Sequence, residues 1–347
     1  MLGNARTATK AGLNALGLAL AACSGAASTG DSAASTDRDA ASPTPSAAAS
    51  PVETELPAAR PVDVEATPIE PRVEARVELP GGPDYLAAAA GSIWVRKDDG
   101  VVVRIDPADS TEIATLTTSE DLCQGLGADD AAVWSRTDGG GVVRIAPATN
   151  EVAATVEVSK YNDQGHIPVA FGRAWVLVDD GSRLVGIADD AVDVDIDLGS
   201  NCIQLVASDT ALWVVCLTDG LVLAVDPDSG EITTRVPGLE GARNIAVADD
   251  VWVGFDGGLA RIDAASGRVT GVADVPSGFS GYVVATADDV WVRTGGRFLR
   301  HVEADTMEVV EELHAPEVSG DFVLVAYDSV WTTAYDDAVL YRVAPTP

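Results

Sequence analysis

Apolar residues in this chain occur in short runs, and Asp, Gly and Ala separate one run from the next. In residues 245–275 the runs cover 245–248, 251–255, 259–263 and 268–275, with turn-forming residues between them. Short β-rich runs bounded by such residues are typical of antiparallel strands. No segment of useful length has the periodicity of a helix. The pattern predicts an all-β chain built from four-stranded units.

The four-stranded unit repeats along the chain, and tryptophan marks each copy. Each of the seven tryptophans lies in the second run of its repeat, 38 to 41 residues from its neighbours. They are Trp94, Trp134, Trp175, Trp213, Trp252, Trp291 and Trp331. Repeats of about 40 residues with four strands each are typical of propeller blades. We therefore predict a seven-bladed β-propeller in which each tryptophan packs between blades.

The two ends of the repeat region predict how the ring closes. The last repeat has its third run at residues 339–343 and then ends, so its fourth strand is missing. Residues 73–79 precede the first tryptophan repeat and resemble the outermost strands of the other repeats. We predict that this N-terminal strand joins the last blade and closes a propeller that covers residues 72–347.

The N-terminus has the features of an export signal. Met1 to Lys10 carries two basic residues and no acidic one, and an apolar run that is too short to span a bilayer follows. The sequence Leu-Ala-Ala-Cys, which ends at Cys23, resembles the bacterial lipobox, whose cysteine is acylated and becomes the mature N-terminus. We predict a signal peptide over residues 1–22, lipidation of Cys23, and anchoring on the extracytoplasmic face of a bacterial cell membrane.

Composition sets apart the segment that follows, residues 23–71. After Cys23 it is dominated by Ala, Ser, Thr and Pro, with few residues to bury, so we predict a disordered tether. The whole chain has 54 acidic and 22 basic residues and a net charge of -32. Such a charge repels phosphate backbones, so no nucleic acid partner is expected.

Side chains at the channel mouth are the candidate site. The residue nine positions before each tryptophan is expected there, and this is where the repeat stops repeating. These residues are Tyr85, Gly125, His166, Gln204, Arg243, Tyr282 and Phe322, with Gln124, Asn244 and Asp321 next to them. Such a set suits a small polar ligand. The alternative is a set of varied loops that bind nothing.

The blade motif resembles a known family of propellers. The stretch IWVRKDDGVVVRIDPADSTE from Ile93 is similar to repeats of the streptogramin lyase (virginiamycin B lyase-like) and YVTN propellers. The resemblance covers residues 73–347, and it implies a metal-assisted elimination that uses histidine and glutamate near the channel. His166 is the only histidine of the predicted mouth, and no glutamate accompanies it. We therefore predict no cofactor and no catalytic residue, and a divalent metal belongs only to the alternative of a lyase or lactonase.

The remaining cysteines suggest one disulfide. Cys202 and Cys216 flank a predicted hairpin turn, and an oxidising location permits their pairing, with Cys123 left free. With the lipid anchor and the mouth, these features favour a membrane-anchored binding module for a polar ligand or an envelope protein. The alternatives are the metal-dependent enzyme and a purely structural or sensory domain.

Overall fold

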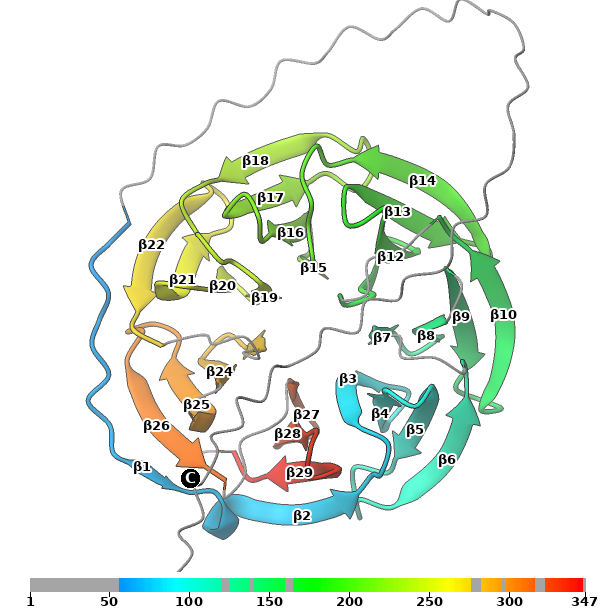
Figure 1. The fold of residues 1–347 in the computed structure, drawn as a ribbon, viewed down its shortest axis with the longest axis horizontal. Helices are drawn as coiled ribbons and strands as arrows, with labels where there is room; N and C mark the ends of the chain where they lie inside the picture. The colour runs from blue at the N-terminus through cyan, green and yellow to red at the C-terminus, as the bar shows by residue number, and fades with distance from the viewer. Residues whose placement is uncertain are drawn as a thin grey trace, which may run out of the picture. The chain divides into compact units, whose positions relative to one another are not determined.

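Seven blades surround a central axis in this chain (Figure 1). The computed structural model describes residues 56–119, 125–137, 140–159, 165–275, 282–294, 297–315 and 322–345. All of these residues belong to one compact unit. Among them, no helix is long and apolar enough to cross a membrane. The predicted seven-bladed, all-β fold is confirmed.

Each of the first four blades is an antiparallel sheet whose strands follow one another from the channel outward (Figure 1). Blade 1 contains β3 (Pro83–Ala89), β4 (Ser92–Lys97), β5 (Val101–Ile105) and β6 (Glu112–Thr117). Blade 2 contains β7 (Leu126–Ala128), β8 (Val133–Thr137), β9 (Gly141–Ala146) and β10 (Glu151–Glu157). Blade 3 contains β11 (Val169–Ala170), β12 (Arg173–Val178), β13 (Arg183–Ala188) and β14 (Ala191–Asp197). Blade 4 contains β15 (Gln204–Ala207), β16 (Leu212–Cys216), β17 (Leu221–Val225) and β18 (Ile232–Val236).

Blades 6 and 7, unlike blade 5, include strands from the N-terminal part of the chain. Blade 5 contains β19 (Asn244–Val247), β20 (Val251–Phe255), β21 (Gly258–Asp263) and β22 (Arg268–Ala273). Blade 6 contains β23 (Val283–Ala285), β24 (Asp289–Thr294), β25 (Arg297–Glu303) and β26 (Val309–His314), with β1 (Ala66–Pro68) outside them. Blade 7 contains β27 (Val323–Ala326), β28 (Ser329–Ala334) and β29 (Val339–Val343), and β2 (Val73–Glu78) is its outermost strand.

The ring closes as predicted, through pairing of β2 with β29. The two strands are antiparallel, and their register runs from Val73 opposite Val343 to Glu78 opposite Val339. Strands from the two ends of the repeat region therefore share one sheet. Closure leaves no blade with an unfilled fourth position.

A β-bulge occurs at the same step in the outermost strand of every blade. It lies beside the third-strand residue that pairs with the tryptophan. The bulged residues are Ile113, Ala153, Asp193, Thr233, Thr270, Val310 and Glu74. Bulges bend a strand and hinder the pairing of its edge with other chains. The repeat thus protects the outer edges of its sheets.

Tryptophan and arginine connect neighbouring blades. The seven tryptophans are between 0% and 5% exposed, as expected for residues that pack between blades. The guanidinium of Arg104 lies 5.0 Å from the ring of Trp94. Its Nη1 donates a hydrogen bond of 2.6 Å to the carbonyl of Pro147 in blade 2. In the same way, Arg342 of blade 7 stacks on its tryptophan and reaches blade 1.

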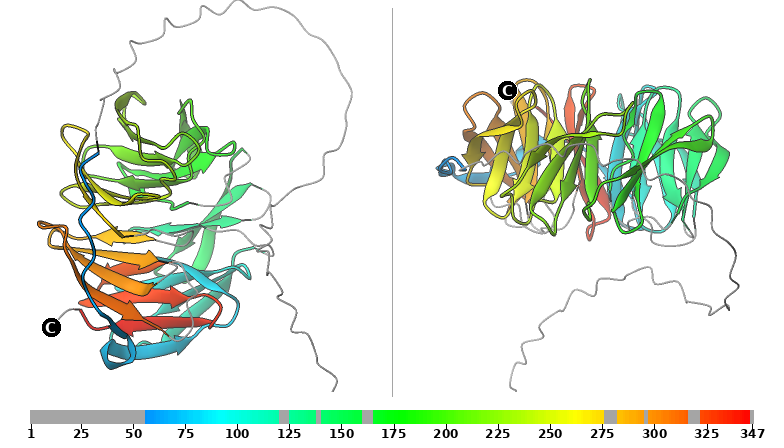
Figure 2. Two further views of the ribbon diagram at one scale, coloured as in Figure 1. Left: turned by 60° about the vertical axis from the view of Figure 1, so that its left-hand side comes forward. Right: turned by 90° about the horizontal axis from the view of Figure 1, so that it is seen from above.

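Part of the predicted tether, residues 56–71, lies on the propeller. Residues 56–72, called the strap below, run along the outside of blades 5 and 6 (Figure 2). Within the strap, β1 pairs in parallel with β26, and Ile69 is 1% exposed. Val62 and Val64 pack against the core of the adjoining blades. These few apolar side chains bind an existing sheet edge, so residues 56–71 need no core of their own and do not belong to a free tether.

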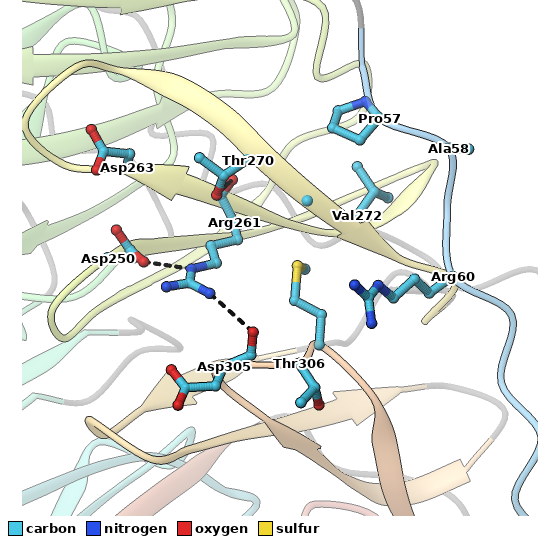
Figure 3. A pocket seen from close by; sticks show the side chains of 12 residues that line it. Pro57, Ala58, Arg60, Asp250, Arg261, Asp263, Thr270, Val272, Asp305 and Thr306 are labelled. Carbon is cyan, nitrogen blue, oxygen red and sulfur yellow. Dashed lines mark hydrogen bonds and ion pairs between the residues drawn. The ribbon is translucent and has the colours of Figure 1, made fainter.

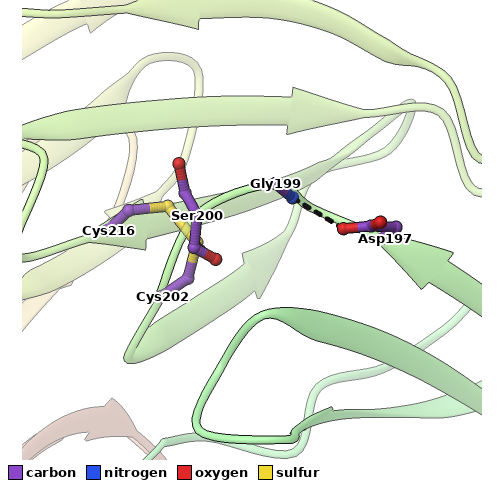
Figure 4. Close-up of a disulfide and its surroundings, with 5 residues drawn as sticks. All are labelled: Asp197, Gly199, Ser200, Cys202 and Cys216. Carbon is purple, nitrogen blue, oxygen red and sulfur yellow. Dashed lines mark hydrogen bonds between the residues drawn. A yellow bond between two sulfur atoms is a disulfide. The ribbon is translucent and has the colours of Figure 1, made fainter.

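The structure contains a disulfide between Cys202 and Cys216 (Figure 4). Cys202 lies just before β15, and Cys216 is the last residue of β16. The bond joins the start of the innermost strand of blade 4 to the end of the next strand. Cys23 and Cys123 lie outside the described residues.

Candidate functional site

Five of the predicted mouth residues lie together on the channel axis. Tyr85, His166, Gln204, Tyr282 and Phe322 come from blades 1, 3, 4, 6 and 7 and are called the plug below. The ring centroids of Tyr282 and Phe322 are 4.5 Å apart. Those of His166 and Phe322, like those of Tyr85 and Phe322, are 4.9 Å apart. Side chains that meet from opposite sides of the ring fill the channel at this level.

Hydrogen bonds join the polar atoms of the plug to one another. The hydroxyl of Tyr282 donates to Tyr85 Oη at 2.8 Å, and the Gly165 N–H donates to the same oxygen at 3.0 Å. Gln204 donates from Nε2 to Tyr282 Oη at 3.2 Å and accepts from the His166 N–H at 3.0 Å. Buried polar groups that satisfy one another fix a unique arrangement of side chains. The plug is therefore a specified structural unit.

Burial determines the protonation of the plug. Desolvation lowers the pKa of His166 to about 4, so its imidazole is neutral at pH 7. Burial is also the main cause that raises the pKa of Tyr85, with the nearby Asp84 carboxyl adding to the effect. Both groups are uncharged near neutrality. The plug thus presents neutral hydrogen-bonding groups between aromatic rings.

The structure places the other predicted mouth residues elsewhere, or they lie outside the residues that it describes. The Arg243 guanidinium lies 3.7 Å from the Asp256 carboxylate of its own blade, and its Nε donates to the Gly241 carbonyl. Asn244 begins β19 and is buried. Gln124 and Asp321 lie outside the described residues, as does the loop just before Gly125. Arg243 therefore contributes to the wall of blade 5.

A cavity of about 470 Å³ continues the channel from the plug. Its lining comes from the innermost strands of all seven blades, with His166 and Phe322 at the plug and Ser208 and Asp209 at a turn of blade 4. Most lining side chains between them are small and apolar. They include Ala88, Ala128, Ala207, Ala246 and Ala285. The channel is therefore a pocket with an aromatic end and an apolar wall.

The apolar wall is the feature of the channel that the sequence analysis missed. A signal for it exists, since the residue six positions before the tryptophan is alanine in five of the seven repeats. These alanines line the cavity, and they take up less space there than larger side chains would. Among the described residues, no group of three or more His, Cys, Asp or Glu could hold a metal ion.

Comparisons with known proteins support the fold alone. No protein-family model matches the chain, and no curated protein matches it either. Among solved structures, the chain is similar to the β-propeller domain of Cps50 (Swd1) from Myceliophteria thermophila, with a TM-score of 0.67 and 12% sequence identity. The match covers 79% of this chain and 99% of that one. At this identity the similarity shows a shared propeller fold.

Proposed function

We propose that this chain is a membrane-anchored, extracytoplasmic binding protein that holds a compact, largely apolar ligand in its channel. The observation that carries the proposal is the 470 Å³ cavity between the plug and the turns of the opposite end. Pockets of small-molecule sites typically have about 300 to 1,000 Å³ and an apolar lining with a few polar groups. The channel fits this description.

The lining determines the chemistry of the ligand. Alanine and valine side chains from opposite blades offer dispersion contacts and no charge. At the plug, the neutral imidazole of His166 offers one hydrogen-bonding group beside the ring of Phe322. A ligand with one polar end and an apolar body satisfies both parts. This proposal replaces the polar ligand expected from the sequence, because the tyrosine hydroxyls and the Gln204 amide of the plug are bonded to one another.

The proposed location rests on the N-terminal sequence. The basic residues, the short apolar run and the lipobox that ends at Cys23 support export and acylation. The tether that the sequence predicts includes the 32 residues 24–55, which separate Cys23 from the strap. A flexible chain of 32 residues spans roughly 30 Å, enough for the proposed anchor to leave the propeller clear of the lipid surface.

Binding of a neutral fluorescent probe tests the channel. N-phenyl-1-naphthylamine brightens on entering an apolar pocket, and we expect saturable binding to the full chain. Replacing both Ala88 and Ala207 by leucine fills the channel from opposite blades and is expected to abolish this binding. Ala153→Leu adds the same group to an exposed outer strand and is the matched control. Equal binding by all three proteins would exclude the channel as the site.

Cell fractionation tests the anchor. The wild-type chain is expected in the membrane fraction and to incorporate labelled palmitate, whereas Cys23→Ala is expected to lose the label. An unlabelled wild-type chain would refute the lipid anchor. It would leave the channel proposal intact, because the probe experiment does not depend on location.

A further inference from the structure

A second cavity lies at the outer face of the ring, between blades 5 and 6. It has a volume of about 460 Å³, and the strap forms one of its walls (Figure 3). Blade 5 contributes Arg261 and Gly271, blade 6 contributes Asp305 and Met307, and the strap contributes Arg60. We call this cavity the outer groove. It is separate from the channel, which the innermost strands line.

Gly271 gives the groove its floor. Gly271 of β22 pairs with Arg261 of β21, which in turn pairs with Trp252 of β20. At the corresponding position, every other blade has a residue with a side chain. Those residues are Ala75, Ala114, Ala154, Val194, Thr234 and Glu311. A Cβ at Gly271 would lie 2.2 Å from Met307 Sδ, which is too close for any real contact. The Met307 side chain therefore packs directly against Gly271, and a side chain at residue 271 would displace it.

Met307 occupies a backbone conformation that a bulky residue rarely adopts. Its φ is 59°, in the left-handed region, and its N–H closes a turn on the Glu303 carbonyl. The same position of the same turn holds small or polar residues in four other blades, namely Ser110, Asn150, Gly230 and Gly267. The turn is thus a feature of the repeat, and in blade 6 it places the buried thioether of Met307 at the floor of the groove.

Arg60 is held in place by its backbone. Its N–H donates to the Val272 carbonyl at 2.9 Å, and its carbonyl accepts from the Asp274 N–H at 2.8 Å. In the part of the chain that the structure describes, no hydrogen bond or ion pair uses its guanidinium. Figure 3 shows this group on the groove side of the strap, across from Thr306. The backbone of Arg60 is thus fixed, and its exposed guanidinium faces the cavity and is available to a ligand.

The guanidinium of Arg261 is bonded to other residues of the protein. Its Nε donates to Asp250 Oδ2 at 2.5 Å, and its Nη1 donates to the carbonyls of Ala304 at 3.2 Å and Asp305 at 3.4 Å (Figure 3). It thereby ties blade 5 to the turn of blade 6 that carries Met307. The wall opposite the strap is therefore preorganised.

The charges of the lining select the ligand. The side chains of Arg60 and Arg261 oppose those of Asp250, Asp263 and Asp305, which leaves a formal charge of 2 − 3 = −1. Three carboxylates and a chain charge of -32 disfavour an anion, and two guanidinium groups disfavour a simple cation. A neutral ligand with many hydroxyl groups can donate to the carboxylates and accept from Arg60. Its C–H face can pack on Met307, a side chain that adapts to varied surfaces.

We propose that the outer groove binds a neutral carbohydrate, with Arg60 and Asp305 bonding its hydroxyl groups and Gly271 and Met307 supporting its apolar face. The volume lies within the range of small-molecule sites. The strap completes the site, since without it Arg60 and one wall are lost. The channel proposal is independent of this one.

Calorimetric titration of the full chain with neutral disaccharides tests the proposal. The probes are maltose, cellobiose and N,N′-diacetylchitobiose, and we expect at least one to bind in the millimolar range or tighter. Arg60→Gln keeps the strap backbone, and Asp305→Asn keeps the size of the side chain. Each removes a charge-assisted hydrogen bond and should weaken binding by about tenfold or more.

Two matched variants make the result specific to the groove. Asp228 lies at the position of Asp305 in the equivalent turn of blade 4, and Arg235 lies on the outermost strand of that blade. Asp228→Asn and Arg235→Gln are expected to bind as the wild type does. Failure of all three disaccharides to bind would overturn the proposal. Equal weakening by the control variants, or binding of glucuronate in preference to the neutral sugars, would overturn it as well.

Discussion

The hydroxyl of Tyr282 donates a hydrogen bond to the hydroxyl of Tyr85 across the channel, at 2.8 Å, although 197 residues separate them in the chain. Tyr85 Oη also accepts from the Gly165 N–H at 3.0 Å. The plug therefore joins blades that share no sheet. Its polar contacts are expected to contribute to the stability of the closed ring.

Tyr85→Phe should lower the free energy of unfolding by about 1 to 3 kcal/mol, because buried partners lose their acceptor. Tyr282→Phe should also destabilise the protein, because Gln204 Nε2 loses the acceptor that it bonds at 3.2 Å, although Tyr85 Oη still accepts from Gly165. Urea unfolding of both single variants and the double variant gives the coupling energy, which should lie at about 0.5 to 3 kcal/mol. Additive effects would show that the two hydroxyl groups act independently.

Arg342 is expected to hold the first and last blades together. Its Nη1 donates to the Pro107 carbonyl of blade 1 at 2.7 Å, and its guanidinium lies 5.5 Å from the Trp331 ring. Arg342→Ala should cost about 2 to 4 kcal/mol from the lost charged hydrogen bonds and stacking. The exposed pair of Arg76 and Glu78 gives the control, and Arg76→Ala should cost less than about 1 kcal/mol. If Arg342→Ala and Arg76→Ala lowered the stability in thermal and urea unfolding by similar amounts, Arg342 would have no special role in closing the ring.

His166 should make stability depend on pH. Its pKa is about 4 in the folded protein and about 6.5 in an unfolded chain, so the unfolded state binds more protons between these values. Stability should therefore fall as pH decreases from about 6.5 to 4, by at most about 3 kcal/mol. His166→Gln should flatten this part of the profile. An unchanged profile in His166→Gln would show that another group causes the slope.

The disulfide of blade 4 should stabilise the fold by restricting the unfolded chain. Cys202 and Cys216 are 14 residues apart, and a closed loop of about that length is worth about 3 kcal/mol. Reduction, or replacement of both residues by serine, should lower the midpoint of urea unfolding. With Cys23 acylated, one of the four cysteines, Cys123, should react with a thiol reagent in the denatured, unreduced chain. Detection of three reactive thiols would exclude the bond.

Gly127 should tolerate no side chain. A Cβ at this position would lie 1.6 Å from the carbonyl oxygen of Ile167, a backbone atom of the next blade. Gly127→Ala must therefore push blades 2 and 3 apart, and we expect a loss of about 3 kcal/mol or more in unfolding experiments. Ala128→Gly changes the adjacent residue without adding atoms and is the control. A fully stable Gly127→Ala protein would show that the two blades separate easily.

The sequence contains enough information for the ring but too little for the strap. Seven tryptophans at one spacing predict seven blades, because every blade uses the same local pattern to bury the same residue. Residues 56–71 have no such pattern. Their few valines and one isoleucine become buried only because the outer edges of blades 5 and 6 already exist.

By itself, the sequence predicted the five residues of the plug, since a fixed offset from the tryptophan is a local property of each blade. The same offset also selected Arg243, which the structure places beside Asp256 of its own blade. The tertiary structure alone decided whether those side chains would leave an open mouth or touch. Tyr85, His166, Tyr282 and Phe322 are far apart in the chain, and the distance between them depends on the radius of the closed ring. The fit of Gly271 to Met307 was decided in the same way, because it arises between two blades and no pattern within one repeat encodes it.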